Sequence, residues 1–308
     1  IVEYNATTTS NYTTFPNGYV VHPGFEYSST ASGLWVAKFE ASQSDAGVTS
    51  TDMGSSGIIK IQPGVTSWRS ITISDMYTKC LNYAGTTLGN ASLNSHLMKN
   101  SEWGAVAYLS RSEYGKNGEI WINPNSNYIT GQAGKGPSVG STADTYAYTD
   151  KTYGVQASTT GNIYGIYDMS GGSTEFIAAY MDNSYVKEPG TEGAASSNNR
   201  YEVGEALIKG ASYTKDVYAV GETESAANNY AANQGKYGDA IWETSNSVAS
   251  PYTNSWYQDC SSFPGTTAPF FYRGGGYGDT TYAGAFYFSN SSGTANAGIG
   301  FRPVLVVL

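Results

Sequence analysis

The stretch of sequence that decides the fold is FYRGGGYGDTTYAGAFYFSNSSGTANAGIGFRPVLVVL, residues Phe271–Leu308. It begins with an Arg-Gly-Gly-Gly run and ends with Gly-Phe-Arg-Pro before an apolar strand. Between these two markers nearly every residue is Tyr, Ser, Thr, Asn, Asp, Gly or Ala. We expect Arg273 and Arg302 to be buried donors to loop carbonyls, and Gly274 and Gly275 to permit positive φ or close backbone approach.

The polar segment between the markers is expected to divide into core and surface positions. Phe286, Phe288 and Phe301 are predicted to fill the core and to close a sheet. Tyrosine supplies a large rigid contact area at low entropy cost, and small polar residues adapt their hydrogen bonds. The positions expected to point outward, as ligand contacts, are Tyr277, Asp279, Thr280, Thr281, Tyr282, Tyr287, Ser289, Asn290, Ser292, Thr294, Asn296 and Ile299. The alternative is a solvated loop with scattered tyrosines.

The composition points away from the cytosol and from nucleic acid. Only 13% of the residues are charged, whereas 37 are Gly and 27 are Tyr. A surface made polar by Ser, Thr, Asn and Tyr suits secreted, cell-surface or virion proteins, so we expect an extracellular, cell-surface or virion location. The net charge of -9 argues against nucleic acid or an anionic membrane as a partner. No apolar run approaches the ~18 residues that span a bilayer, so no direct membrane insertion is expected.

The chain reads as α+β. GLWVAKFEAS, residues Gly33–Ser42, alternates apolar and polar residues and predicts a half-buried strand. One helix is predicted from a cap at Ser74 to a stop at Gly85, and a second follows a cap at Asn100 or Ser101. Beyond these two early helices the sequence predicts only short strands and long irregular loops, and no further helix.

The first residues differ from the rest of the chain. Residues 1–32 are rich in Thr, Ser and Tyr without an apolar period, and they predict an extended N-terminal arm. Residues 33–308 show neither a repeat nor a linker, and they predict a single domain. Such an arm can add a strand to the sheet edge of a neighbouring copy. A structural subunit of an extracellular filament, pilus or phage tail is therefore the alternative reading.

The sequence contains no recognisable set of catalytic residues, and it does not decide whether the cysteines are paired. HExxH is absent, and the histidines, His22 and His96, lie in unrelated contexts. Cys80 and Cys260 are too few for a structural zinc site. They form either one disulfide, which closes a loop of ~180 residues and contributes about 4 kcal/mol, or two unpaired buried thiols.

Three motifs resemble one protein family. GNIYGIYDMSGGSTEF (Gly161–Phe176) resembles N-x-[FY]-G-[LI]-Y-D-M-x-G-N-V-W-E-W of the formylglycine-generating-enzyme-like, or sulfatase-modifying factor, branch of the C-type lectin fold. RGGGY (Arg273–Tyr277) resembles its RGGSW, and GFRPV (Gly300–Val304) its terminal GFR. LWVAKFEAS and HLMKNSEWGAVAYLSRSEYG resemble bacterial surface, pilin-like and prophage proteins that carry this domain. The resemblance covers residues 30–308 and implies a C-type lectin fold with twisted antiparallel sheets.

Departures from the family pattern limit what the resemblance implies. The enzyme uses a pair of cysteines just after its RGG motif, whereas this chain has none there. Its oxidase activity is therefore not expected, and the chain is predicted to be no enzyme and to require no cofactor. The family can bind calcium near its central motif, which makes Glu175 a candidate ligand, although Gly172 replaces the usual Asn. The alternative, which we favour, is that Asp168 and Glu175 orient loops through backbone hydrogen bonds.

The closing segment also resembles the variable proteins of diversity-generating retroelements. Those proteins carry RGG, then AG-x-F, then GFRPV, with a tolerant segment between them. Errors in copying AAY codons reach Tyr, Ser, Thr, Asp, Ala, Gly, Ile and Phe, and every residue from Tyr277 to Ile299 belongs to the reachable set. The rest of the chain is also poor in the excluded types.

Together these observations predict a surface-exposed recognition module, such as an adhesin or receptor-binding protein. We expect it to bind a protein or a glycan on another cell or surface, without catalysis. Self-assembly into a filament or oligomer is compatible with this reading. The leading expected contacts are Tyr277, Tyr282, Tyr287 and Asn290.

Overall fold

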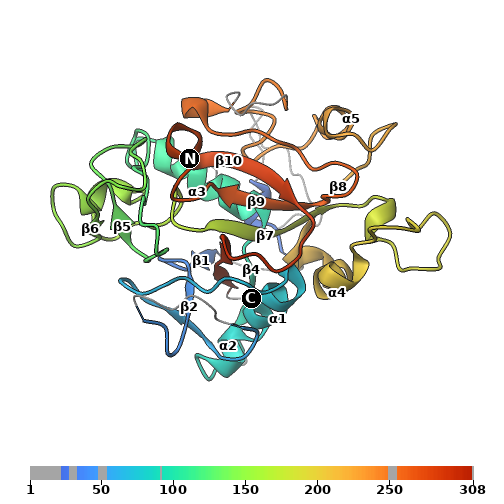
Figure 1. The fold of residues 1–308 in the computed structure, drawn as a ribbon, viewed down its shortest axis with the longest axis horizontal. Coiled ribbons are helices and arrows are strands. Elements are labelled where there is room, and N and C mark those ends of the chain that lie inside the picture. Colours follow the sequence, from blue (N-terminus) through green and yellow to red (C-terminus); the bar gives the residue numbers. More distant parts are fainter. Residues whose placement is uncertain (1–21, 28–32, 48–53, 91, 249–254, 307–308) are drawn as a thin grey trace.

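The computed structural model describes residues 22–27, 33–47, 54–90, 92–248 and 255–306. Over these ranges the chain combines helices with several small sheets (Figure 1). The α+β class predicted from the sequence is therefore confirmed. Of the predicted arm, residues 1–21 and 28–32 lie outside the described residues, and the remainder contains a short 3-10 helix, η1 (Pro23–Phe25).

The helices lie around the sheets rather than forming a layer of their own (Figure 1). The α-helices of the described residues are α1 (Ile73–Leu81), α2 (Tyr83–Thr86), α3 (Asn100–Arg111), α4 (Tyr201–Lys209) and α5 (Ala226–Ala232). The other 3-10 helices are η2 (Gly154–Ala157), η3 (Ser184–Val186), η4 (Ser212–Thr214), η5 (Trp256–Gln258) and η6 (Thr280–Tyr282).

The two early helices are present, but the prediction of no later helix was wrong. The sequence did not predict helix α4 because Gly204 interrupts its apolar pattern. A Cβ at Gly204 would lie 2.3 Å from the ring of Phe270, so this glycine permits the helix to approach the sheet closely. Helix α1 also begins earlier than predicted. Its cap is Thr72, not Ser74: Thr72 Oγ1 accepts from Asp75 N at 3.1 Å, and the Asp75 carboxylate accepts from Thr72 N at 3.3 Å.

The central sheet has the strand order β10-β9-β7-β11, with β8 paired to β7. The pairs β10–β9 and β9–β7 are antiparallel, whereas β11 and β8 run parallel to β7. The expectation of antiparallel sheets alone was therefore incomplete, because this sheet is mixed. Its strands are β7 (Thr174–Met181), β8 (Asp216–Tyr218), β9 (Phe270–Gly274), β10 (Gly284–Ser291) and β11 (Ile299–Phe301).

Smaller antiparallel sheets complete the fold. One has the order β1-β12-β4, so that a strand near the start of the domain pairs with the last described strand. Two others each contain a single pair, β2–β3 and β5–β6. The bounds are β1 (Leu34–Val36), β2 (Ala41–Gln43), β3 (Ile59–Ile61), β4 (Asn94–Leu97), β5 (Gln132–Ala133), β6 (Tyr146–Ala147) and β12 (Pro303–Val306).

Strand β7 is buried along its whole length because both of its faces are covered. Ile177, Ala179 and Met181 face one core cluster, which includes Trp103 of α3. The alternate residues, beginning with Phe176, face a second cluster that includes residues of α1 and α4. Side chains of a strand alternate between its faces, so a strand covered on both sides is an unbroken run of apolar or small residues. This explains the run FIAAYM, residues 176–181, whereas Glu175 at the start of the strand is a buried charge paired with Arg302.

The two predicted anchor arginines are fully buried. Arg302 Nε donates to Glu175 Oε2 at 2.7 Å, and its Nη2 donates to the other carboxylate oxygen, which makes a two-pronged ion pair. Arg302 also donates to the carbonyl of Ala37 at 3.1 Å and to those of Tyr167 and Asp168 at 3.1 and 3.2 Å. One guanidinium thus joins β7, the start of β12 and two loops, which is the donor role that the sequence predicts.

Arg273 has a similar donor role on the same face of the sheet, because it is the register partner of Glu175. Its Nε donates to Asn100 Oδ1 at 2.7 Å, and its Nη1 donates at 3.3 Å to the carbonyls of Ala240 and Tyr287. Gly274 and Gly275 follow with φ of 86° and 71°, in the region that favours glycine. A side chain on Gly275 would lie 2.9 Å from Ala283 Cβ. The Arg-Gly-Gly run therefore combines a buried donor with a turn of restricted space.

Replacing Glu175 by Gln is predicted to lower the free energy of unfolding by about 3 kcal/mol, because it leaves the Arg302 charge without its ion-pair partner. Asp168 lies close enough to offset part of that charge, so we expect the lower end of the usual range. Urea denaturation measures the change. The control is Glu205→Gln, which breaks the exposed pair with Lys209 and should leave the midpoint almost unchanged. Equal effects of the two changes would contradict the anchoring role.

A second prediction concerns Glu40, whose carboxylate is buried against Ser173 N at 3.1 Å and Ser173 Oγ at 2.5 Å. Burial, followed by the charges of Glu175 and Asp168, raises the pKa of Glu40 well above its ordinary value. The folded protein therefore holds this proton more tightly than the unfolded chain. The stability that Glu40 contributes is fully present below its unfolded pKa and is lost as the pH rises through its folded pKa.

We expect Glu40→Gln, which mimics the protonated acid, to remove this part of the pH dependence. The unfolding free energy of the wild type should fall more steeply with rising pH than that of the variant, and the two should differ most at the alkaline end. Urea denaturation across a pH series measures both slopes, and Glu205→Gln again serves as the control. Parallel profiles for wild type and Glu40→Gln would refute the assignment of a buried proton to this site.

Candidate functional site

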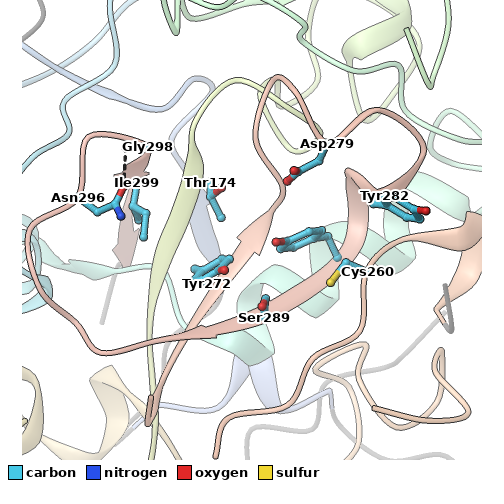
Figure 2. A pocket seen from close by; sticks show the side chains of 10 residues that line it. Thr174, Cys260, Tyr272, Asp279, Tyr282, Ser289, Asn296, Gly298 and Ile299 are labelled. Atoms are coloured by element: carbon cyan, nitrogen blue, oxygen red, sulfur yellow. Dashed lines mark hydrogen bonds between the residues drawn. The ribbon is translucent and has the colours of Figure 1, made fainter. Parts of the chain in front are cut away.

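A pocket of about 480 Å³ opens over the central sheet, within the size range of ligand sites. Its walls come from strands β7, β9, β10 and β11, from η6 and from the loops that flank them (Figure 2). The lining residues are Thr174, Cys260, Tyr272, Asp279, Tyr282, Tyr287, Ser289, Asn296, Gly298 and Ile299.

Neighbouring strands place the floor of the pocket. Tyr272 on β9 pairs in register with Ser289 on β10, and Thr174 on β7 pairs with Ile299 on β11. Thr174 lies two residues before Phe176 and so shares its face of β7, which α1 and α4 cover farther along. The pocket therefore occupies the part of this face beyond the apolar cluster. A floor built on paired strands is rigid, as binding sites require.

Two tyrosines form the centre of the floor. The rings of Tyr272 and Tyr287 are nearly parallel, with centroids 6.0 Å apart and planes at 25°. On the other side of the strand, Arg273 Nη1 donates to the carbonyl of Tyr287. The anchor arginine thus holds the backbone that carries a floor residue.

The rim comes from the loops at either end of the polar segment. Asp279 Oδ2 accepts from Gly276 N at 2.8 Å, which fixes the start of η6. Tyr282, at the end of η6, is 38% exposed, and its carbonyl accepts from Cys260 N at 2.9 Å. On the opposite side Asn296 Oδ1 accepts from Gly298 N at 2.7 Å. Figure 2 shows Asp279 and Tyr282 on one side of the cavity and Asn296 on the other.

The structure brings half of the twelve predicted contacts into this pocket: Asp279, Tyr282, Tyr287, Ser289, Asn296 and Ile299. Three of them do not point freely outward, because Tyr287, Ser289 and Ile299 are buried in the floor. That part of the prediction was wrong, since strands β10 and β11 lie within the sheet rather than in a loop. These three side chains are accessible only through the cavity.

The other predicted contacts lie outside the pocket lining. Tyr277 is half-buried with its ring edge-on to Tyr128, the centroids being 5.0 Å apart. Asn290 Nδ2 donates to Ser262 Oγ at 2.9 Å, so this side chain connects β10 to the loop that precedes β9. Thr280 and Thr281 lie in η6, and the hydroxyls of Ser292 and Thr294 bond to each other at 3.0 Å.

Sequence reasoning missed four lining residues: Thr174, Cys260, Tyr272 and Gly298. Tyr272 had a usable signal, because it lies next to the buried Arg273 in a strand and must therefore face the opposite side. Cys260 had none, since it enters the pocket from a distant loop.

Both cysteines are free, buried thiols. Of the two alternatives, the structure therefore has the two unpaired thiols and not the disulfide. Cys80 is buried in the cluster between α1 and the sheet, whereas Cys260 lines the pocket. Burial, and then the Asp279 charge, raise the pKa of the Cys260 thiol to about 12. The thiol is therefore neutral at physiological pH, and a neutral thiol is a poor nucleophile.

The carboxylates near the central motif act as structural groups. Both oxygens of Asp168 accept from Gly131 N, at 2.9 and 3.0 Å, and Oδ1 also accepts from Asn123 Nδ2 at 3.0 Å. Both oxygens of Glu175 accept from Arg302. Among the described residues no three His, Cys, Asp or Glu side chains are grouped to hold a metal ion. A calcium role for Glu175 thus stays a prediction that its geometry does not favour.

No model of a known protein family matches this chain, and no curated protein is significantly similar to it. Within the part of the chain that the structure describes, no helix is long and apolar enough to cross a membrane.

The thiol assignment gives a direct prediction. Under denaturing conditions without reductant, a thiol reagent should detect two free thiols per chain. In the native protein both should react slowly, because Cys80 is enclosed in the core and the Cys260 thiol is protonated. The variant Cys260→Ser should show one thiol after denaturation. A chain that shows no thiols until reductant is added would instead contain the disulfide.

Proposed function

We propose that this chain is a non-catalytic recognition module with a C-type lectin fold. It binds a protein or glycan ligand through the pocket over β7, β9, β10 and β11, at a cell surface, on a virion or in the extracellular space. The observation that carries the proposal is the origin of the pocket. Seven of its ten lining residues belong to the one polar segment between Arg273 and Arg302, and the buried anchors support that segment from behind.

The positions of the three family-like motifs support the fold assignment. In sequence they are far apart, around Glu175, Arg273 and Gly300. In the sheet these three residues are register partners, Arg273 opposite Glu175 and Glu175 opposite Gly300. Motifs that resemble one family and also meet in one row across three adjacent strands are best explained by a shared fold.

The chemistry of the pocket supports binding without catalysis. Its lining holds one carboxylate, one neutral thiol, three tyrosines and small polar groups. General acid–base or nucleophilic catalysis requires an activated nucleophile beside a base, and the raised pKa of Cys260 is the reverse of activation. Tyrosine with small polar residues is instead the composition of binding surfaces.

Tyr282 provides the test of this proposal, because its side chain is partly exposed at the rim. The wild-type chain and Tyr282→Ala are applied to arrays of glycans and of cell-surface proteins. We expect Tyr282→Ala to lose at least about tenfold in affinity for the ligand captured by the wild type, while the melting temperature shifts by less than about 3 °C.

The matched control is Tyr164→Ala, which removes a tyrosine that is 84% exposed and lies outside the pocket lining. It should bind as the wild type does. Tyr287→Ala should lower the melting temperature as well as the affinity, because that ring is buried. Capture that is unchanged in Tyr282→Ala but lost in Tyr164→Ala would place the binding surface elsewhere.

A further inference from the structure

We infer that the pocket accepts a basic side chain, lysine or arginine, presented by a partner protein. This inference rests on the proposed recognition function and names the chemistry of its ligand. It is carried by three observations on the same cavity: a single carboxylate without a counter-ion, aromatic rings around it, and the cost of covering that carboxylate with a neutral group.

The charge of the pocket is uncompensated. Asp279 is the one charged side chain in the lining, where no Lys, Arg or His is found. None of the ion pairs among the described residues involves Asp279. Gly276 N donates to its Oδ2. Burial raises the pKa values of Cys260, Tyr272 and Tyr287, and the charge of Asp279 adds a smaller contribution to each.

The arginines beside the pocket are engaged outside its lining: Arg273 is buried behind the floor, and Arg69 bonds to a neighbouring loop. Arg69 lies with its guanidinium carbon 3.9 Å from the centroid of the Tyr128 ring, and its Nη1 donates to the carbonyl of Ala297. Tyr128 in turn contacts Tyr277. The chain thus uses a guanidinium on a tyrosine face close to the pocket, but none of its described side chains supplies a cation inside it.

Three tyrosines line the cavity together with Asp279. Tyr272 and Tyr287 form the floor, and Tyr282 lies at the rim, to the right of Asp279 in Figure 2. The faces of aromatic rings carry negative potential and attract ammonium and guanidinium groups, by about 0.5–2 kcal/mol. The methylene stem of a lysine or arginine packs on the same rings while its head reaches a carboxylate.

A neutral ligand fits this pocket less well than a cation. Asp279 is half-buried, and a ligand that covers it removes the water that now solvates the charge. A sugar hydroxyl restores a hydrogen bond but no charge, whereas a guanidinium or ammonium restores both. The net charge of -9 also favours encounter with a basic partner.

The direct test compares two peptides that differ by one charge. The full chain is titrated, with NMR detection, with Gly-Gly-Arg-Gly-Gly and with the same peptide carrying citrulline, the neutral isostere of arginine. We expect the arginine peptide to bind at least about tenfold more tightly, which corresponds to about 1.4 kcal/mol. Asp279→Asn should abolish this preference, whereas Asp45→Asn, which removes an exposed carboxylate elsewhere, should retain it. Equal binding of the two peptides by the wild type, or a preference that survives Asp279→Asn, overturns the inference.

The glycan and protein arrays separate failure of this inference from failure of the proposed function. Capture of neutral glycans that is lost in Tyr282→Ala but kept in Asp279→Asn overturns the basic side chain and leaves the recognition function standing. Capture of proteins that is lost in both variants supports the two together. If neither peptide binds and no capture depends on Tyr282, both are overturned.

Discussion

The buried ion pair between Arg302 and Glu175 is the interaction on which the rest of the structure depends. A guanidinium removed from water is tolerated only when a partner of opposite charge and enough acceptors surround it. Here the acceptors are the Glu175 carboxylate and three carbonyls from two other loops of the chain. Because each of these groups must be in position at once, the ion pair couples β7, the C-terminal strands and the β1 end of the domain. Because the ion pair holds these strands in place, the sheet beneath the pocket is rigid.

The sequence permits prediction of the parts whose signal is local or carries an unusual chemical demand. The α+β class, the two early helices and the burial of Arg273 and Arg302 follow from periodicity and from the Arg-Gly-Gly and Gly-Phe-Arg patterns. The predicted caps were wrong, because α1 is capped by Thr72 and α3 by Lys99. The burial of Tyr287 in the pocket floor was not predictable from composition, because whether that segment forms a strand depends on the pairing of β10 with β9. Cys260 and Thr174 enter the pocket from distant segments, and only the tertiary fold brings them there.

The buried carboxylates of the core and the carboxylate of Asp279 have opposite roles. Glu40, Asp168 and Glu175 surround one guanidinium in the core, where hydrogen bonds and a raised pKa at Glu40 limit the cost of burial. Asp279 lies at the surface of the same sheet without a cation from its own chain. The first arrangement stabilises the fold. The second leaves a negative charge available for a partner.

The anchor arginines bond mainly to main-chain oxygen atoms, and this has a consequence for change in the sequence. Arg273 donates to the carbonyls of Asp239, Ala240 and Tyr287, and Arg302 to those of Ala37, Tyr167 and Asp168. Every amino acid carries the same carbonyl, so these bonds survive whatever side chain stands at the accepting position. Tyr287 is the acceptor that belongs to the segment lining the pocket, and its bond to Arg273 therefore does not depend on which side chain stands there. A substitution at that position changes the pocket lining but keeps this main-chain hydrogen bond.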